Sequence, residues 1–591
     1  MRYTEDSFSK REYNVVNAGT DPALGRHGCL TFGATAPAEK PQEADMRITN
    51  KIMQRNNLSN INTNKVLEDN LTSQLSSEKK IIRPSDDPVI AIRALRLRSN
   101  VTEVTQYYSK NIPDAKSWLK VTEDALSSLS SIITSCQNDC TKGANGDLTS
   151  SDRNIILEEL KAFSSEIYKT GDADYAGRYV FTGYRTDTSL SFQKATNMRY
   201  QLTEQLNRTA IDSVTHVTQG SVANWTAANF NDAAHNTLVE QDISESTCYR
   251  FRLSYSDLDS YEDGEYRNDM LKYDDGTGNM LPVTRPMIQY YNASGVLTTL
   301  NCTDEIRSTE VPDPYSLVGD NSVIYVPDTG EILIGTNIYN TLMATKDDAT
   351  TGDVDESQIQ ITYQKTEFTA ENLRPQHFFR CASMEGELDA SGNFVVETDS
   401  LIRYNESYLD TTLERQSIEY DVGFNTTIRV NSTADECFKL GIGREIDDLV
   451  NAMQAVVDLE STIADMEKKI SVTTNTAELE VLHNQLDAAN KAYTYQKDIA
   501  QKRFEQGITS MQGFLNDTSL AITNNGTRSS KLELIDSRLQ NQKTTFETLQ
   551  SENEDIDITE VAINLESASV TYQAALMATS KIMQNTLLNY L

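Results

Sequence analysis

Length, composition and charge limit the possible domain number and partners of this chain before any motif is considered. It has 591 residues, which is long enough for two or three domains. Acidic side chains outnumber basic ones by 87 to 53, giving a formal net charge of -34 and a pI near 4.6. Such a surface repels nucleic acid and anionic membranes, so neither is expected as a partner. Most of the acidic excess lies between Ala195 and Asp435, which predicts a solvated middle and chain ends that make contacts.

The cysteines and the apolar runs exclude further classes. Seven cysteines without a CxxC pair argue against a disulfide framework. Cys136 and Cys140 are four positions apart, but no His or third Cys lies beside them, so we interpret them as apolar helix residues rather than metal ligands. No run approaches about 18 apolar residues, and no basic region followed by an apolar one opens the chain. We therefore expect no membrane insertion and no Sec-type signal.

The N-terminal part divides at Met46. Residues 1–45 interleave Gly, Pro and charges with no sustained period of 2 or 3.6, which predicts a disordered segment or one that is not native to the mature protein. We expect the native chain to start at Met46, where a helical pattern begins. Asparagine fills many of the following positions and lowers helix propensity, so this helix needs neighbours. Its apolar residues at helical spacing are Ile48, Ile52, Leu67, Leu71 and Leu75.

Stronger helix signals follow. Asp87 is a predicted N-cap and Pro88 occupies the first helical position. An alternating four-three stripe of apolar residues comes next, as in helices that pack against long partners. Pro113 falls inside this stripe and is expected to bend or restart the helix. After the turn GANGDLTSSD, Thr149 or Ser150 is predicted to cap another helix.

The sequence pattern changes from helical to β-prone in the middle of the chain and becomes helical again later. Residues 191–438 contain Gly, Asp, Thr and Tyr clusters between short β-prone runs, which predicts a β-rich insert. Helical stripes resume at Ile442, and the Asn-Asn-Gly sequence at residues 524–526 is predicted to mark the last chain reversal. Helices at both ends around a β insert predict a mainly α protein, an antiparallel helical rod that carries an outward β domain.

The final helix has an unusual composition. After Glu566 its only charged side chain is Lys581, while Ser, Thr, Gln and Asn supply the remaining polarity. A solvated helix usually exposes charged residues, so this helix is expected to bury both its apolar and its polar face. Weak segments at opposite chain ends are typical of segments that fold on assembly. The candidate assembly residues here are Val561, Leu565, Ala568, Tyr572, Leu576, Ile582, Met583 and Leu587.

Linked motifs at both ends resemble the bacterial flagellin family. MRITNKIM, LSSEKKIIRPSDDPVIAIRAL, TEDALSSL and LTSSDRNIILEEL follow the order and spacing of the family's N-terminal region, and the last 37 residues are similar to its C-terminal region. GDADYAGRYVFTGYRTDTSLSF is similar to the family's junction proteins rather than to filament flagellin. The resemblance implies a terminal coiled-coil domain (residues 46–84 with 557–591), a helical rod domain (85–190 with 439–556) and a variable insert (191–438).

Motifs for catalysis are not found. The five histidines are isolated and none has the HExxH spacing of a zinc peptidase, and neither a G-x-S-x-G elbow nor a P-loop occurs. The acidic runs DLDSYEDGEY, YDDGTGN and DDATTGDVDES do not fit a calcium loop, so we expect them to form solvated surface. No enzyme activity and no cofactor are expected.

The resemblance implies a secreted structural subunit at the junction of hook and filament, exported through the flagellar type III pathway. The implied partners are further copies in a ring, hook-associated protein 1, flagellin and an export chaperone. Two alternatives stay open: filament flagellin itself, and a flagellin-like protein whose insert is adhesive or enzymatic.

Overall fold

A computed structural model describes residues 50–218, 239–261, 272–274, 280–282, 285–311, 313–344, 359–388, 394–396, 401–408 and 415–584. The expectation for residues 1–45 lies outside these ranges, as do Ile48 and Leu587. Residue contacts divide the chain into two compact units. One unit combines the residues up to Ile82 with those from Ile556 onward, and the other runs from Arg83 to Asp555.

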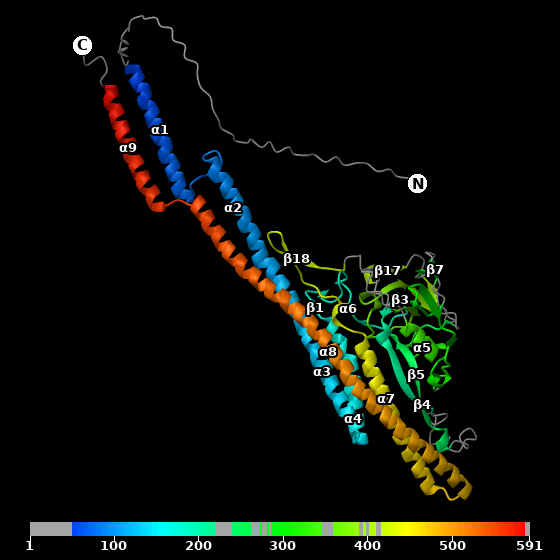
Figure 1. The fold of residues 1–591 in the computed structure, drawn as a ribbon. Helices are drawn as coiled ribbons and strands as arrows, with labels where there is room; N and C mark the ends of the chain where they lie inside the picture. Colours follow the sequence, from blue (N-terminus) through cyan, green and yellow to red (C-terminus); the bar gives the residue numbers. More distant parts are fainter. Residues whose placement is uncertain are drawn as a thin grey trace, which may run out of the picture. The chain divides into compact units, whose positions relative to one another are not determined.

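The first unit pairs helices from the two ends of the chain. α1 (Asn50–Ser77) and α9 (Ile558–Gln584) lie side by side in opposite directions (Figure 1). The Asp557 side chain caps α9 by accepting bonds from the amides of Thr559 and Glu560 at 2.9 and 3.2 Å. The Ile556 amide donates to the Glu78 carbonyl at 3.2 Å and so links the segment before α9 to the segment after α1.

The second unit begins with the predicted capped helix. The Asp87 side chain accepts bonds from the amides of Val89 and Ile90, and Pro88 opens α2 (Pro88–Gln106), which confirms both assignments. A π-helical turn (Tyr107–Asn111) then interrupts the α-helical pattern, and α3 (Ile112–Gly143) restarts with Pro113 in its first turn. The helical backbone continues through this turn, so Pro113 changes the hydrogen-bond pattern without ending the helix. A proline has no amide to donate, and a π turn accommodates this gap.

The helix that follows is also capped as expected. α4 (Ser150–Ile167) begins after Thr149, whose hydroxyl accepts a bond from the Asp152 amide while the Asp152 carboxylate accepts one from the Thr149 amide. This reciprocal arrangement satisfies two amides that the first helical turn would leave unbonded. Thr149, not Ser150, is therefore the N-cap.

The C-terminal half corrects one prediction. α7 (Gly441–Val472) is followed by α8 (Thr476–Glu554), a single helix of 79 residues that continues through residues 524–526. The reversal expected at Asn-Asn-Gly is wrong. Asn525 is buried and its side-chain amide donates to the Leu119 carbonyl of α3 at 2.9 Å. Packing of α8 against α2, α3 and α7 thus outweighs a helix propensity cost of about 1 kcal/mol at the glycine (Figure 1).

Two sheets occupy the middle of the chain. The six-stranded sheet has the order β17-β14-β3-β13-β8-β9 and is antiparallel throughout. Its strands are β3 (Arg199–Leu206), β8 (Met287–Tyr291), β9 (Leu297–Asn301), β13 (Ile359–Lys365), β14 (Arg380–Met384) and β17 (Ile402–Tyr404).

The five-stranded sheet has the order β10-β11-β12-β5-β4, in which only the β10-β11 pair is parallel. Its strands are β4 (Ile211–Thr218), β5 (Ser244–Arg252), β10 (Asp304–Glu305), β11 (Val323–Val326) and β12 (Glu331–Ile334).

Short elements complete the described residues. The two-stranded pairs are β1 (Asp174–Tyr175) with β2 (Arg178–Tyr179), β6 (Lys272–Asp274) with β7 (Met280–Pro282), β15 (Gly386–Leu388) with β16 (Phe394–Val396), and β18 (Glu419–Gly423) with β19 (Thr426–Arg429). Two short helices, α5 (Thr336–Met343) and α6 (Ala434–Cys437), also lie in this region. Helices at both ends with sheets between them match the fold class expected from the sequence at this level of detail.

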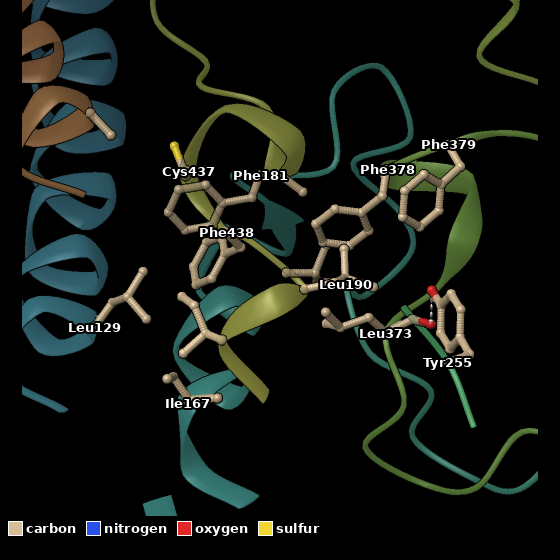
Figure 2. Close-up of a cluster of buried hydrophobic side chains, with 14 of the residues drawn as sticks. Leu129, Ile167, Phe181, Leu190, Tyr255, Leu373, Phe378, Phe379, Cys437 and Phe438 are labelled. Atoms are coloured by element: carbon tan, nitrogen blue, oxygen red, sulfur yellow. Dashed lines mark hydrogen bonds between the residues drawn. The ribbon is translucent and has the colours of Figure 1, made fainter. Parts of the chain in front are cut away.

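One apolar core joins the helices to the sheets of the second unit. Leu129 of α3 and Ile167 of α4 point toward a cluster that contains Phe181 and Phe438, whose rings meet edge to face at 4.9 Å (Figure 2). Further along the cluster the Tyr255 hydroxyl donates to the Leu373 carbonyl at 2.9 Å. Because this core is continuous, the sheets pack on the helices as parts of one unit.

Candidate assembly interface

The α1/α9 pair is held together by a narrow stripe. On α9 the residues that face α1 recur at four-three spacing, and Val561 and Ala568 are only 9% and 6% exposed. Leu565 and Tyr572 lie on the same stripe and are half-buried. This is the spacing of two helices that pack along a common seam.

The matching stripe on α1 is much less apolar. Its half-buried residues also recur at four-three spacing, and they are Asn57, Ile61, Asn64, Glu68, Leu71 and Leu75. Three of these six are polar, so the seam buries little apolar surface. Helices of 28 and 27 residues with so weak a seam gain only a little stability from each other, since helices in proteins depend mainly on tertiary packing.

A second apolar stripe on α9 has no partner among the described residues. Ile563, Val570 and Met577 are 63%, 61% and 68% exposed and lie seven positions apart, so they share one face of the helix. Leu576 beside them is 43% exposed. On α1 the large exposed apolar residues are Ile52, Met53, Leu58, Val66 and Leu67. Large exposed apolar residues that recur on one face of a helix are candidates for an interaction surface.

The structure places the assembly residues predicted from the sequence in different environments. Leu71, Leu75, Val561, Leu565, Ala568 and Tyr572 lie on the seam between α1 and α9, whereas Ile52, Leu67 and Leu576 are exposed. Ile582 and Met583 belong to the last turn of α9. The sequence reasoning missed Ile563, Val570 and Met577, although their spacing of seven residues was visible in the sequence.

A similar exposed row lies on α2 in the second unit. Val89, Ile92 and Leu95 recur every three residues and are each more than half exposed, while Ala91 and Ala94 on the other face are buried against α8. The end of α8 fixes this helix. Arg98 donates two hydrogen bonds to the Glu554 carboxylate at 2.8 and 2.5 Å, and this pairing raises the pKa of Arg98.

The β18–β19 hairpin contacts the π turn between α2 and α3. The Tyr107 and Phe424 rings meet edge to face at 5.9 Å, and the Asn111 side-chain amide donates to the Asp421 carbonyl at 2.8 Å. Hydroxyls of Tyr420 and Tyr175 both donate to Asp114 of α3. Burial alone would raise the pKa of Asp114, but these two bonds and nearby Arg178 hold it below its ordinary value.

A buried ionic cluster joins the five-stranded sheet to α7 and α8. Arg250 and Arg252 of β5 and Arg503 of α8 converge on Asp448 and Glu445 of α7. The Asp448 carboxylate lies 2.5 Å from Arg252 and 2.9 Å from Arg503, and it also pairs with Arg250. Burial alone would raise the pKa of Asp448, but the arginines lower it to about 2. The cluster links the five-stranded sheet to both helices through ion pairs.

The two closely spaced thiols are buried rather than exposed. Cys136 and Cys140 are buried in the core, and burial raises the pKa of each thiol to about 12, so both behave as apolar helix residues as expected. Among the described residues, no group of three His, Cys, Asp or Glu side chains is placed to hold a metal ion.

One part of the acidic surface was predicted wrongly. Asp259, in the first acidic run, is buried rather than solvated: its carboxylate accepts bonds from the amide and the hydroxyl of Thr366, both at 2.7 Å. Arg199 lies 3.5 Å from the same carboxylate. A charged side chain is tolerated in the interior when it is paired and hydrogen-bonded in this way. The other two runs lie wholly or largely outside the described residues.

Comparisons with known proteins give a family match in the N-terminal part and curated relatives for part of the chain. Residues 48–186 match the family model of the bacterial flagellin N-terminal helical region. Flagellar hook-associated protein 3 of Salmonella typhimurium is 28% identical over 203 residues, which are 34% of this chain and 62% of the relative. The protein of the same name from Escherichia coli is 26% identical over 146 residues, 24% of this chain and 45% of the relative. The chain therefore spans about half to three-fifths of these curated relatives.

Solved structures resemble the chain more distantly. FlgL of Xanthomonas campestris is 12% identical, with a TM-score of 0.24, over 76% of this chain and 98% of that structure. In the part of the chain that the structure describes, no helix is both long and apolar enough to cross a membrane.

Proposed function

We propose that this chain is a structural subunit of the bacterial flagellum that joins the hook to the filament. It is exported through the flagellar type III pathway, forms a ring with further copies of itself, and contacts hook-associated protein 1 on one side and flagellin on the other. The names of the two curated relatives and the match of residues 48–186 to the flagellin family model support this proposal. It assigns the chain no catalytic role and no cofactor.

The single observation that carries the mechanism is the second apolar stripe of α9. Burying a Val, Ile or Met side chain contributes about 1.5–3 kcal/mol. Because some 60–70% of Ile563, Val570 and Met577 is exposed, covering the three in an assembly would contribute about 3–6 kcal/mol per subunit. That amount is large beside the weak α1/α9 seam. The terminal helices would therefore become stable only when neighbouring subunits cover them.

The remaining parts of the chain have distinct roles in this proposal. Residues 46–84 with 557–591 form the terminal coiled coil that packs inside the assembled tube. Residues 85–190 with 439–556 form a helical rod domain, whose row of Val89, Ile92 and Leu95 contacts a neighbouring copy. Residues 191–438 form the outer insert, held on the rod by the cluster around Asp448. An export chaperone would cover the terminal helices before assembly.

Imaging the protein on the flagellum tests the proposal against its main alternative. An epitope inserted in the acidic run DDATTGDVDES would be labelled with gold on intact flagella. We expect one band of label where the hook meets the filament, and hooks without filaments in cells that lack the gene. Label along the whole filament would instead identify the chain as filament flagellin, and label away from the flagellum would contradict the proposal.

A further inference from the structure

The longest edge strand of the two large described sheets is β4. Among the described strands of the five-stranded sheet, β4 pairs only with β5. It has eight residues, whereas the other terminal strands β9, β17 and β10 have five, three and two. Proteins often keep edge strands short to prevent pairing with other chains. β4 is long and contains five β-branched residues, so it is well suited to accept a further strand.

A groove of about 980 Å³ runs along this edge. Every residue from Ile211 to Val217 lines it. Side chains of a strand alternate between two faces, so seven successive residues line one groove when the groove follows the backbone edge. The groove also extends over the face of the sheet toward α7, because Arg250 of β5 and Glu331 of β12 line it as well. The opposite wall is formed by α7 and α8, which pass beside β4 (Figure 1). The groove is at the upper end of the roughly 300–1,000 Å³ found for ligand pockets.

The lining of the groove is acidic. Six carboxylates and four basic side chains line it, namely Asp212, Asp313, Asp328, Glu331, Asp447 and Asp448 with Arg250, Arg444, Lys502 and Arg503. Arg250 and Arg503 are already paired with carboxylates inside the ionic cluster. Among the described residues, neither Asp313 nor Asp328 has a lysine or arginine within ion-pair distance. Burial lowers the pKa of His216 and raises the pKa of Asp313, and the charge interaction between these two groups opposes both shifts.

We propose that this groove binds an extended, basic segment of another protein as an added β-strand beside β4. The backbone amides and carbonyls of the segment pair with the free edge of β4, as in other cases of strand addition. A lysine or arginine side chain of the segment faces Asp313, which interacts with His216 of β4. Charge complementarity selects this occupant over an acidic one. The site lies away from α1 and α9 in sequence and does not depend on the flagellar assignment.

Peptide binding to the full-length chain tests the inference. The probe is a fluorescent, end-capped heptapeptide of alternating lysine and valine, measured by anisotropy. We expect micromolar binding, at least tenfold weaker binding of the same peptide with N-methylated valines, and none of a glutamate-valine peptide. Hydrogen exchange of β4 should slow when the lysine peptide is bound.

Matched variants locate the site. Ala455→Trp fills the groove from α7 and should weaken binding at least tenfold, whereas Ala464→Trp, exposed on the same helix outside the groove, should not change it. Asp313→Asn leaves the shape intact and should weaken binding several-fold even if Ala455→Trp misfolds. No binding, equal binding of the N-methylated peptide, or no effect of Asp313→Asn would overturn the inference. A dimer of the chain that Ala455→Trp dissociates would identify a second copy as the occupant instead.

Discussion

The proposed assembly role of α9 makes a sharp prediction for Met577→Asp. Met577 is 68% exposed, so about a third of its surface is covered within the chain and the substitution should change monomer stability by less than about 1 kcal/mol. Met577 is a better probe than Leu576, whose 43% exposure means that more of its packing lies within the chain. In an assembly the aspartate would lose about 1–2 kcal/mol of apolar burial. An unpaired buried carboxylate adds about 3–5 kcal/mol.

The total of about 4–7 kcal/mol corresponds to a loss of roughly a thousandfold or more in the association constant per contact. Thermal unfolding of purified monomers, followed by circular dichroism, measures the stability of each variant. Filament attachment and motility of cells that carry the variant measure its assembly. Met577→Leu, which nearly conserves volume, is the control and should assemble normally. A Met577→Asp monomer that unfolds many degrees earlier would show that this face is packed within one subunit. A variant that assembles like the wild type would refute the interface.

Three further predictions concern the second unit. Asp448→Asn removes a carboxylate shared by three arginines and should destabilise the protein by about 3–5 kcal/mol in urea unfolding. Because the folded pKa of Asp448 is depressed to about 2, its contribution to folding stability is present above pH 4 and is lost as the pH falls toward 2. Asp448→Asn should lack this part of the acid-induced loss of stability. Asn525→Ala should destabilise by about 1–2 kcal/mol through loss of its bond to α3, whereas Asn524→Ala, exposed beside it, should stabilise by a few tenths. Gly143→Ala would place a methyl group 2.2 Å from the Phe504 ring and should lower the free energy of unfolding by about 1–3 kcal/mol. Gly526→Ala meets no neighbour and should raise it by about 0.5–1 kcal/mol. Both effects are measured as shifts in the thermal midpoint.

The sequence by itself determined the features that depend on neighbouring residues. The caps at Asp87 and Thr149 follow from side chains that bond amides two or three positions ahead. The π turn before Pro113 follows from the missing amide of a single residue. Helical stripes at both ends and β-prone runs between them predicted the arrangement of helices and sheets, because periodicity depends on residues close together in the chain.

The partition of the candidate interface was only partly visible in the sequence. The four-three spacing of Val561, Leu565 and Ala568 indicated an apolar face on α9 but not what covers it. The structure shows that α1 covers this seam, and that the described residues leave the face with Ile563, Val570 and Met577 largely exposed. Spacing gives the faces of a helix, whereas the identity of the partner requires contacts between segments about 500 positions apart in the chain.

Only the tertiary structure decided where local preference yields to packing. Asn-Asn-Gly at residues 524–526 favours a turn locally, yet the bond from Asn525 to α3 and the packing on either side keep α8 continuous. Asp259 belongs to an acidic run that suggests solvent exposure, yet its partners Thr366 and Arg199 come from distant parts of the chain and hold the charge inside. A local propensity of about 1 kcal/mol or less is smaller than the packing and hydrogen-bond energies that distant residues supply, so such sites cannot be assigned from neighbouring residues alone.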